Sequence, residues 1–408
     1  MTTIYVDNAA TTKTSRTAID AMLPYFDKIY GNPSSLHSVG QAAADALRKA
    51  REEAAEVLGC EPSEITFTSG GSEADNQALV SAAAIGARKG KKHIISTAFE
   101  HHAVLHTLKK LEKEGFEVTL LDVHENGMVS ARQVADAIRE DTCLVTVMYA
   151  NNEIGSIQPI AEIGAVCREK GVIFHTDAVQ AVGHIHINVK EENIDMLSLS
   201  AHKFHGPKGV GLLYARRGIR LTNIIEGGAQ ERGKRAGTEN IPGIVGMVAT
   251  LKEANANIDA NAAKVSALRD RLIAGLGKIP HSALNGDRTR RLPGNVSFCF
   301  EGIEGESLLL LLDAKGICAS SGSACTSGSL DPSHVLLAIG LPHEIAHGSL
   351  RLTLGRDTTL EDVDFAVDSL KAMLQNLRMM SPLYEDFQQG KVESVIERFK
   401  ADGFPYAN

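Results

Sequence analysis

Between residues 64 and 214, short apolar runs alternate with helix-forming segments, and this alternation allows few folds. The apolar runs have the length of buried strands. A strand, a helix and a second strand usually give parallel strands whose faces are covered by helices. The sequence therefore predicts an α/β fold with a mainly parallel, helix-covered sheet. The expected strands span residues 64–68, 93–97, 117–121, 143–148, 172–176, 196–199 and 210–214.

A lysine follows the expected strand 196–199, which ends abruptly in Ser200-Ala201-His202-Lys203. A turn rich in Gly and Pro then leads into the next strand, so Lys203 should lie at the mouth of the sheet. Partial loss of hydration there lowers the pKa of an amine and frees it to attack an aldehyde. Pyridoxal phosphate (PLP) chemistry needs such an amine. An exposed loop lysine is the alternative.

An aspartate follows the expected strand 172–176. Ligands of an open parallel sheet bind outside the carboxyl ends of its strands, so Asp177 and Lys203 should face one crevice. A buried carboxylate keeps a pyridine nitrogen protonated, and the cationic ring then accepts electrons. Gln180, one helical turn further on, can bind the phenolic oxygen of the ring. The alternative is that Asp177 only caps a helix.

A glycine-rich turn, Ser69-Gly70-Gly71-Ser72-Glu73, separates an expected strand from an Ala-rich helix. Glycines in this position let backbone N–H groups approach a phosphate, with the positive end of the helix behind it. The turn lacks the G-x-G-x-x-G spacing of dinucleotide sites and the Gly-Lys-Ser/Thr ending of a P-loop. It predicts a phosphate cradle at Gly71 and Ser72, with a simple helix cap at Ser72 as the alternative.

Ordered motifs occur along most of the chain: DNAATT at 7–12, GNPSS at 31–35, HTDAVQ at 175–180, SAHK at 200–203, RAGTEN at 235–240 and SSGSACTSG at 320–328. From Tyr5 to about Thr359 the chain resembles the PLP-dependent cysteine desulfurases of the NifS/IscS type, within the class-V aminotransferase family. The NifS branch is the most similar. The resemblance implies PLP-dependent transferase fold type I, in which a large domain with a mainly parallel sheet carries a smaller α+β domain.

The resemblance also implies roles for individual residues. Either His101 or His102 could stack on the cofactor ring and shuttle protons, and the family pattern selects His101. Asn32, which otherwise suits a turn before Pro, becomes a substrate contact. Arg351 has a planar fork that suits a substrate carboxylate. The implied cofactor contacts are Gly71, Ser72, Asn152, Asp177, Gln180, Ser200, His202, Lys203 and Thr238.

The stretch 320–329 contains five Ser, two Gly and one Cys. Such a composition cannot pack a core and should be mobile, so Cys325 is predicted to be an accessible thiol and not a buried apolar filler. The six cysteines lack a paired C-x-x-C spacing, and no intrinsic metal site is expected. The resemblance leaves open a contact of Cys325 with a transferred iron–sulfur cluster.

These residues predict a desulfurase that converts L-cysteine to L-alanine. Lys203 removes the α-proton, and the thiolate of Cys325 attacks the substrate sulfur and keeps it as a persulfide. A thiol is a poor nucleophile, so His101 is expected to take its proton. The sulfur then goes to an acceptor protein, with an iron–sulfur scaffold expected. The alternatives are a selenocysteine lyase or aminotransferase of the same fold, and a silent scaffold without catalysis.

Composition restricts the partners. The 408 residues are 43% hydrophobic and 23% charged, with a net charge of −8, which argues against nucleic-acid binding. No apolar run approaches the ~20 residues of a membrane span, and the start lacks a basic region before an apolar core. A cytoplasmic protein without membrane contact is expected. In the family, the segment matching 226–238 reaches the partner subunit, where Thr238 would contact the cofactor phosphate, so a homodimer is implied.

Four segments are expected. Residues 1–30 form an N-terminal arm of the small domain, 31–258 a large PLP-binding domain, 259–380 the small domain with the cysteine loop 320–329, and 381–408 a tail. A single helix from about 241 to 276 should link the two domains. In the tail, apolar residues at helical spacing predict a short helix, docked on the small domain or on a sulfur acceptor. These residues are Val392, Val395, Ile396 and Phe399.

Overall fold

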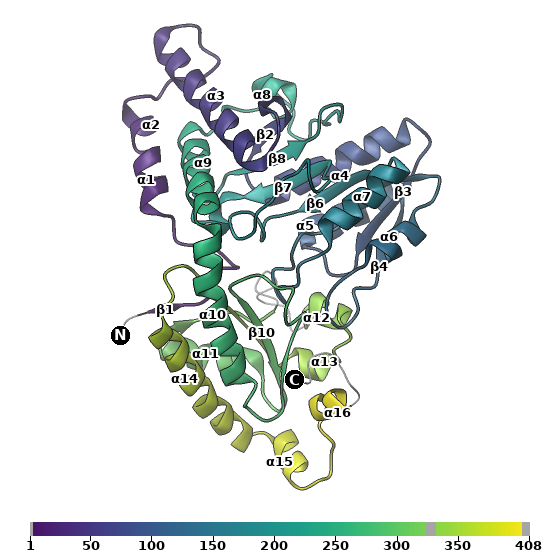
Figure 1. Cartoon of the computed structure of the whole chain (residues 1–408), viewed down its shortest axis with the longest axis vertical. Coiled ribbons are helices and arrows are strands. Elements are labelled where there is room, and N and C mark those ends of the chain that lie inside the picture. The colour runs from purple at the N-terminus through teal and green to yellow at the C-terminus, as the bar shows by residue number, and fades with distance from the viewer. Residues whose placement is uncertain (1–2, 323–331, 402–408) are drawn as a thin grey trace.

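A computed structural model describes residues 3–322 and 332–401 of the chain. Cys325 and the predicted mobility of its loop therefore fall outside the described residues, as does the side chain of Phe399. Figure 1 shows a large sheet in the upper part of the molecule and a smaller sheet below it. The predicted domain boundaries remain predictions.

The large sheet has seven strands in the order β2-β8-β7-β6-β5-β3-β4. Pairs among β3 to β7 are parallel, and β8 runs antiparallel to both of its neighbours. The mainly parallel sheet is thus confirmed. The exception arises because residues 201–210 are too few for a crossover helix, so β8 must return beside β7. The strands are β2 (Ile65–Thr68), β3 (His93–Thr97), β4 (Glu117–Leu121), β5 (Thr142–Thr146), β6 (Ile173–Asp177), β7 (Met196–Ser200) and β8 (Gly211–Ala215).

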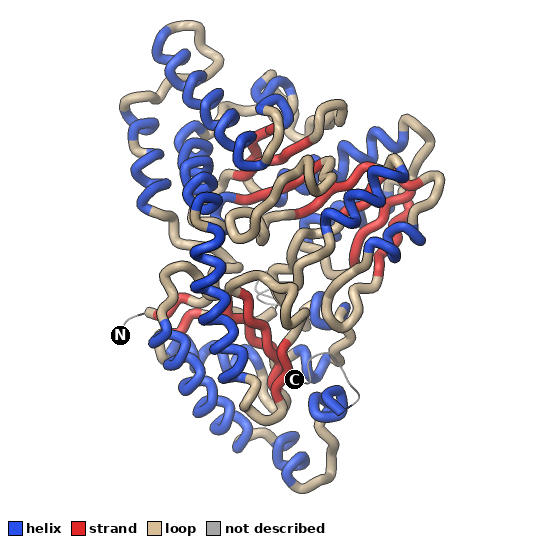
Figure 2. Tube along the Cα trace, viewed as in Figure 1, coloured by secondary structure: helices blue, strands red, loops and turns tan. Residues whose placement is uncertain are grey.

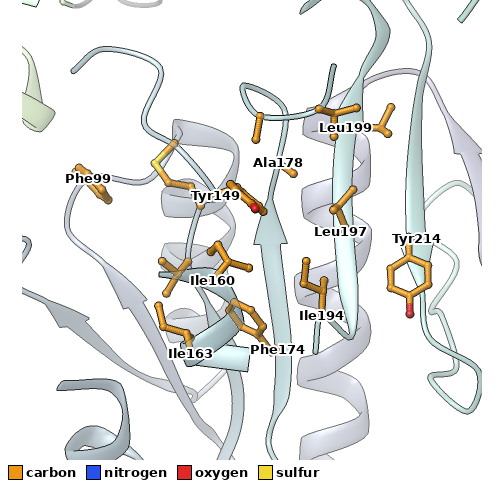
Figure 3. Packing of buried hydrophobic residues seen from close by; sticks show 14 of the residues in the cluster. Phe99, Tyr149, Ile160, Ile163, Phe174, Ala178, Ile194, Leu197, Leu199 and Tyr214 are labelled. Atoms are coloured by element: carbon orange, nitrogen blue, oxygen red, sulfur yellow. The ribbon is translucent and has the colours of Figure 1, made fainter. Parts of the chain in front are cut away.

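Helices cover both faces of this sheet. Successive side chains of a strand point to opposite faces, so Ile94 joins the apolar cluster under α4 and α5, whereas Ile95 joins the cluster under α3, α6, α7 and α9. In the second cluster, Figure 3 shows Ile160 and Ile163 of α7 beside Phe174 of β6. The helices are α3 (Ser38–Leu58), α4 (Gly71–Ala87), α5 (His102–Lys113), α6 (Ala131–Ala137), α7 (Ile160–Lys170) and α9 (Ile241–Ala256).

The smaller sheet is antiparallel, in the order β12-β10-β9 (Figure 2). A parallel pair, β1-β11, lies beside it, and the residues that follow β1 and β11 form bridges to β12 at Asp7–Thr353 and Ser320–Arg351. The apolar core of the smaller sheet is separate and contains Phe298 and Phe300 together with Val6 from the N-terminal arm. The strands are β1 (Ile4–Tyr5), β9 (Ser282–Leu284), β10 (Asn295–Phe300), β11 (Ile317–Cys318) and β12 (Ser349–Thr353). The remaining helices are α1 (Arg16–Met22), α2 (Pro24–Asp27), α8 (Gln230–Gly233), α10 (Ile258–Leu276), α11 (Gly305–Ala314), α12 (His334–Ala338), α13 (His343–Ala346), α14 (Leu360–Met379), α15 (Pro382–Gln388) and α16 (Val395–Ala401).

The single helix predicted over 241–276 is wrong. Asn257, with φ −118° and ψ 10°, interrupts it between α9 and α10. The two helices belong to different apolar cores. Helix α9 packs under the large sheet, and α10 packs against the smaller one. Among the described residues, no helix is both long enough and apolar enough to cross a membrane.

The described part of the tail contains a docked helix, α16, as predicted, and it docks on this chain. The buried carboxylate of Glu301, at the end of β10, accepts hydrogen bonds from the backbone N–H groups of Val395 at 2.7 Å and Ile396 at 3.3 Å, and from the Ser394 hydroxyl. Ile396 is 1% exposed and belongs to the apolar cluster that includes residues of α12 and α13.

We expect Ile396→Ala to lower the free energy of unfolding by about 2–4 kcal/mol, because it removes a fully buried side chain. Val392→Ala is the matched control, since Val392 is 43% exposed. Urea unfolding of both variants measures the difference. Equal stability of the two variants, or no loss of stability on truncation after Met380, would show that the tail is merely tolerated.

Candidate active site

The carboxyl ends of the central strands open onto a cavity of about 580 Å³. It brings together side chains from the N-terminal arm, α4, β6, β7 and β12, which are far apart in the sequence. Most of the predicted site residues line it, namely Gly71, Ser72, His101, Asn152, Asp177, Gln180, Ser200, His202, Lys203 and Arg351. Asn32 and Thr238 are exposed and are not part of this lining.

Lys203 ends the short 3₁₀ turn Ala201–Lys203 that follows β7. Its side chain is half-buried, and Nζ donates hydrogen bonds to the carbonyl oxygens of Ala9 at 2.5 Å and Ala10 at 2.9 Å. The Gln180 amide also donates to the Ala9 carbonyl, at 3.0 Å. The N-terminal arm therefore holds the amine at the rim of the cavity. The sequence did not predict these carbonyl contacts.

Asp177 is the last residue of β6 and is 4% exposed. Its Oδ1 accepts the N–H of Val179 at 2.9 Å, which forms a turn and not a helix cap. Burial raises the pKa of Asp177, while the positive charges of His101 and Lys203 oppose that rise. The carboxylate is thus placed to face a cation inside the cavity.

Asp75, in α4, is a second buried carboxyl that the sequence did not indicate. It is 1% exposed, and ligand atoms of Asp75, His101 and Asp177 lie within 4.8 Å of one another. Burial, and next the negative charge of Asp177, raise the pKa of Asp75 well above its usual range. Two carboxylates so close disfavour each other's ionised form in a buried site, and the upward shift of the pKa is the stronger for Asp75.

The predicted phosphate cradle is the N-terminus of α4. The helix begins at Gly71, and the preceding Gly70 offers no side chain to cap the first N–H groups. Ser72 lies inside the first turn, so the cap proposed for it as an alternative is wrong. A Cβ on Gly71 would lie 2.6 Å from Cγ2 of Val179, so only glycine fits between the cradle and the turn after β6.

The segment 226–238 contacts the cradle helix, although Thr238 itself does not line the cavity. Arg235 Nε donates to Glu73 Oε1 at 2.9 Å, and Glu73 is in the first turn of α4. Asn32 forms a turn, in which its Oδ1 accepts the N–H of Ser34 at 2.9 Å. The roles predicted for Thr238 and Asn32 therefore remain predictions.

The two adjacent histidines occupy different surroundings. His101 caps α5 by accepting the N–H of Ala103 at 3.1 Å, and it lines the cavity. His102 instead lies against His334, with ring centroids 4.6 Å apart. Burial and the neighbouring histidines lower the pKa of His102 to about 4. Of the two, only His101 is placed to exchange protons with a ligand in the cavity.

Arg351, in β12, is 2% exposed and supplies a guanidinium to the cavity. Nη1 donates to the Asn152 carbonyl oxygen at 3.2 Å, and Nη2 donates to Asp7 Oδ1 at 3.1 Å. A ligand carboxylate at Arg351 must therefore share the guanidinium with Asp7. The part played by Asp7 was not predicted, although it opens the DNAATT motif.

Comparisons with known proteins identify the family of the chain. A family model described as "Aminotransferase class-V" matches residues 4–365. The chain is 55% identical over 393 residues to cysteine desulfurase IscS of Clostridium botulinum (strain Hall), covering 96% of this chain and 99% of that protein. It is 56% identical over 380 residues to cysteine desulfurase IscS of Methanosarcina thermophila, covering 93% of this chain and 94% of that protein.

Solved structures are similar to this chain over most of its length. A "NIFS-LIKE PROTEIN" superposes with a TM-score of 0.86 at 38% identity, and covers 92% of this chain and 100% of the other. A structure titled "SspA in complex with cysteine" gives a TM-score of 0.76 at 36% identity, and covers 88% of this chain and 100% of the other.

Proposed function

The chain belongs to the class-V aminotransferase family, and we propose that within it the chain works as a cysteine desulfurase that uses PLP. Two relatives more than 50% identical to this chain carry that name, and a similar structure holds cysteine. The observation that carries the proposal is that Lys203, Asp177 and the uncapped start of α4 face one cavity. That combination suits an aldehyde, a pyridine ring and a phosphate.

The cavity has a suitable polar group for each polar part of PLP. The N–H groups at Gly71 and Ser72 would bind the phosphate, Asp177 the pyridine nitrogen and Gln180 the phenolic oxygen. Deprotonated Asp177 needs a cationic partner, which a protonated ring nitrogen provides. When bound, PLP supplies a sink for the electrons that are released at the substrate α-carbon.

The chain's own residues would do the rest. Arg351 binds the carboxylate of L-cysteine, and the amine of Lys203 takes the α-proton. Cys325 attacks the substrate sulfur as a thiolate, after His101 has accepted its proton. As the S–S bond forms, the bond between the substrate sulfur and its β-carbon breaks, and the β-carbon keeps the electron pair and takes up a proton. The products are alanine and a persulfide on Cys325. An aminotransferase would instead keep the amino group and release a keto acid, and a selenocysteine lyase would not give alanine and transferable sulfur from L-cysteine.

The proposal is tested by the visible absorption of the purified protein before and after L-cysteine is added, together with an amino-acid analysis of the product. We expect a coloured protein whose absorption shifts with L-cysteine, and one alanine released for each sulfur transferred. A colourless protein would favour the silent scaffold. Release of a keto acid without sulfur transfer would favour an aminotransferase.

The remaining parts of the proposal concern partners and location. Large apolar side chains are exposed next to the GNPSS motif: Phe26 is 62%, Tyr30 68% and Leu36 94% exposed. A nearby hollow is lined by Pro33 and by Arg232 of the segment 226–238. These features support a homodimer across this surface, and a particle of 43.6 kDa in mass photometry would contradict it. An iron–sulfur scaffold as sulfur acceptor, and a cytoplasmic location, belong to the same proposal.

A further inference from the structure

Three histidines from two helices lie side by side next to the proposed active site. His102 and His106 are four residues apart in α5, so their side chains share one face of the helix. His334 is the first residue of α12. The ring centres are 5.1 Å apart for His102 and His106, and 4.6 Å apart for His102 and His334. The ring of His102 therefore has an imidazole neighbour from each helix.

The spacing of these rings suits a shared metal ion. An ion about 2.0–2.1 Å from a nitrogen of each of two imidazoles holds the ring centres roughly 5 Å apart. Two histidines four residues apart on a helix bind zinc in the metalloprotease motif for this reason. In the described part of the chain, the nitrogens of the three rings do not all lie within 4.8 Å of one another, so the rings have not closed around one point. His106 is exposed, and its ring can turn toward the other two without leaving a packed core.

His334 also makes the hydrogen bond that is typical of an imidazole ligand. Its Nε2 lies 2.9 Å from the carbonyl oxygen of Glu100, which is fully buried. A carbonyl oxygen only accepts hydrogen bonds, so Nε2 carries the hydrogen and Nδ1 keeps its lone pair. Metal-bound histidines nearly always donate their other ring N–H in this way, and the bond fixes both the tautomer and the orientation of the ring. Nδ1 of His334 is thus prepared to bind an ion.

A metal ligand must also be an uncharged imidazole at neutral pH. Burial, and next the neighbouring histidines, lower the pKa of His102 to about 4. Burial also lowers the pKa of His334, while its hydrogen bond to the Glu100 carbonyl opposes that shift. The charge of Lys109 opposes any further cation here, but this lysine is exposed, so solvent and salt weaken the repulsion.

We propose that His102, His106 and His334 form a binding site for a transition-metal ion that prefers imidazole ligands, for which Zn²⁺ is the probe. Imidazole suits zinc, copper and nickel, whereas Mg²⁺ and Ca²⁺ prefer oxygen ligands. Three histidines leave the fourth position of a tetrahedral zinc ion to water. The site goes beyond the proposed function, because none of its three ligands takes part in the proposed reaction.

The first test measures Zn²⁺ binding to the full, untagged chain by equilibrium dialysis, with accessible thiols blocked beforehand because thiolates also bind zinc. We expect one tightly bound ion per chain. His102→Gln, His106→Gln and His334→Gln should each weaken binding about tenfold or more, because glutamine lacks the ring nitrogen. In His334→Gln the amide can still donate to the Glu100 carbonyl, which preserves that contact. His186→Gln changes an exposed histidine elsewhere on the chain and is the matched control, which should bind as the parent does.

The second test uses the parent protein alone, so that no substitution can disturb the fold. Diethyl pyrocarbonate modifies accessible, uncharged imidazoles, and peptide mass spectrometry reports the rate at each histidine. Zn²⁺ at ten times its dissociation constant should slow the modification of His106 about tenfold, because only the ring without a bound ion reacts. The rate at His186 should not change.

Several results would overturn the site. A parent protein that binds no Zn²⁺, or an equal rate at His106 with and without Zn²⁺, would do so directly. Parent affinity in His334→Gln would leave only the pair on α5. Loss of the ion in Asp75→Asn would place it in the cavity instead, where ligand atoms of Asp75, His101 and Asp177 lie within 4.8 Å of one another. Neither measurement depends on alanine formation, so the site and the proposed function can fail independently.

Discussion

Lys203→Ala should lower alanine formation by about 10³-fold or more, because it removes the amine that is proposed to bind the cofactor and to take the α-proton. The side chain is half-buried at the rim of the cavity and makes its two hydrogen bonds to the carbonyl oxygens of Ala9 and Ala10. Its loss should cost little stability in a chain with cores this large. Product analysis measures the rate, and circular dichroism checks the fold.

The control for this variant is Lys13→Ala, an exposed lysine on the same N-terminal arm that does not line the main cavity. It should retain the parent rate. The absorption of the Lys203→Ala protein supplies a second readout, since the position of its visible band should differ from that of the parent even before L-cysteine is added. Normal alanine production by Lys203→Ala would refute the cofactor assignment.

The sheet could be predicted from the sequence because buried strands leave a local pattern. Strands β3 and β4 begin and end where the apolar runs 93–97 and 117–121 do. The antiparallel direction of β8 follows from the short connection 201–210, but it is visible only once the pairing of β7 and β8 is known. The break at Asn257 could not be predicted from the sequence. It depends on α9 packing in one apolar core and α10 in another, and local periodicity does not show which core a helix joins.

The site divides in the same way. Lys203 and Asp177 could be found because each follows a strand, and strand ends meet at one edge of a parallel sheet. Asp75 could not. It lies inside α4, and the carboxylate beside it, Asp177, comes from β6, which is distant in the sequence. Such long-range contacts leave no local pattern in a sequence.

The five cysteines in the described part of the chain are poor candidates for the nucleophile, which leaves Cys325 as the proposed one. Burial is the first cause that raises the pKa of each of them, so none forms a thiolate readily near neutral pH. The pKa is raised to about 12 for Cys60, Cys167 and Cys299, to about 11 for Cys143, and above its ordinary value for Cys318. A nucleophilic role for any of these five would require a different environment from the one observed.

Cys325→Ser should therefore stop sulfur transfer while leaving the earlier steps intact. The variant should keep the bound cofactor and its absorption change with L-cysteine, because Lys203, Asp177 and the start of α4 are untouched. Alanine release should fall about 10²-fold or more and no persulfide should form, since a serine hydroxyl is scarcely ionised at pH 7 without a dedicated base. Cys318→Ser, seven residues upstream, is the matched control and should keep the parent rate.

If Cys325→Ser released alanine and sulfide as fast as the parent, the cysteine would have no part in the reaction. The chemistry would then be that of a lyase without a protein persulfide.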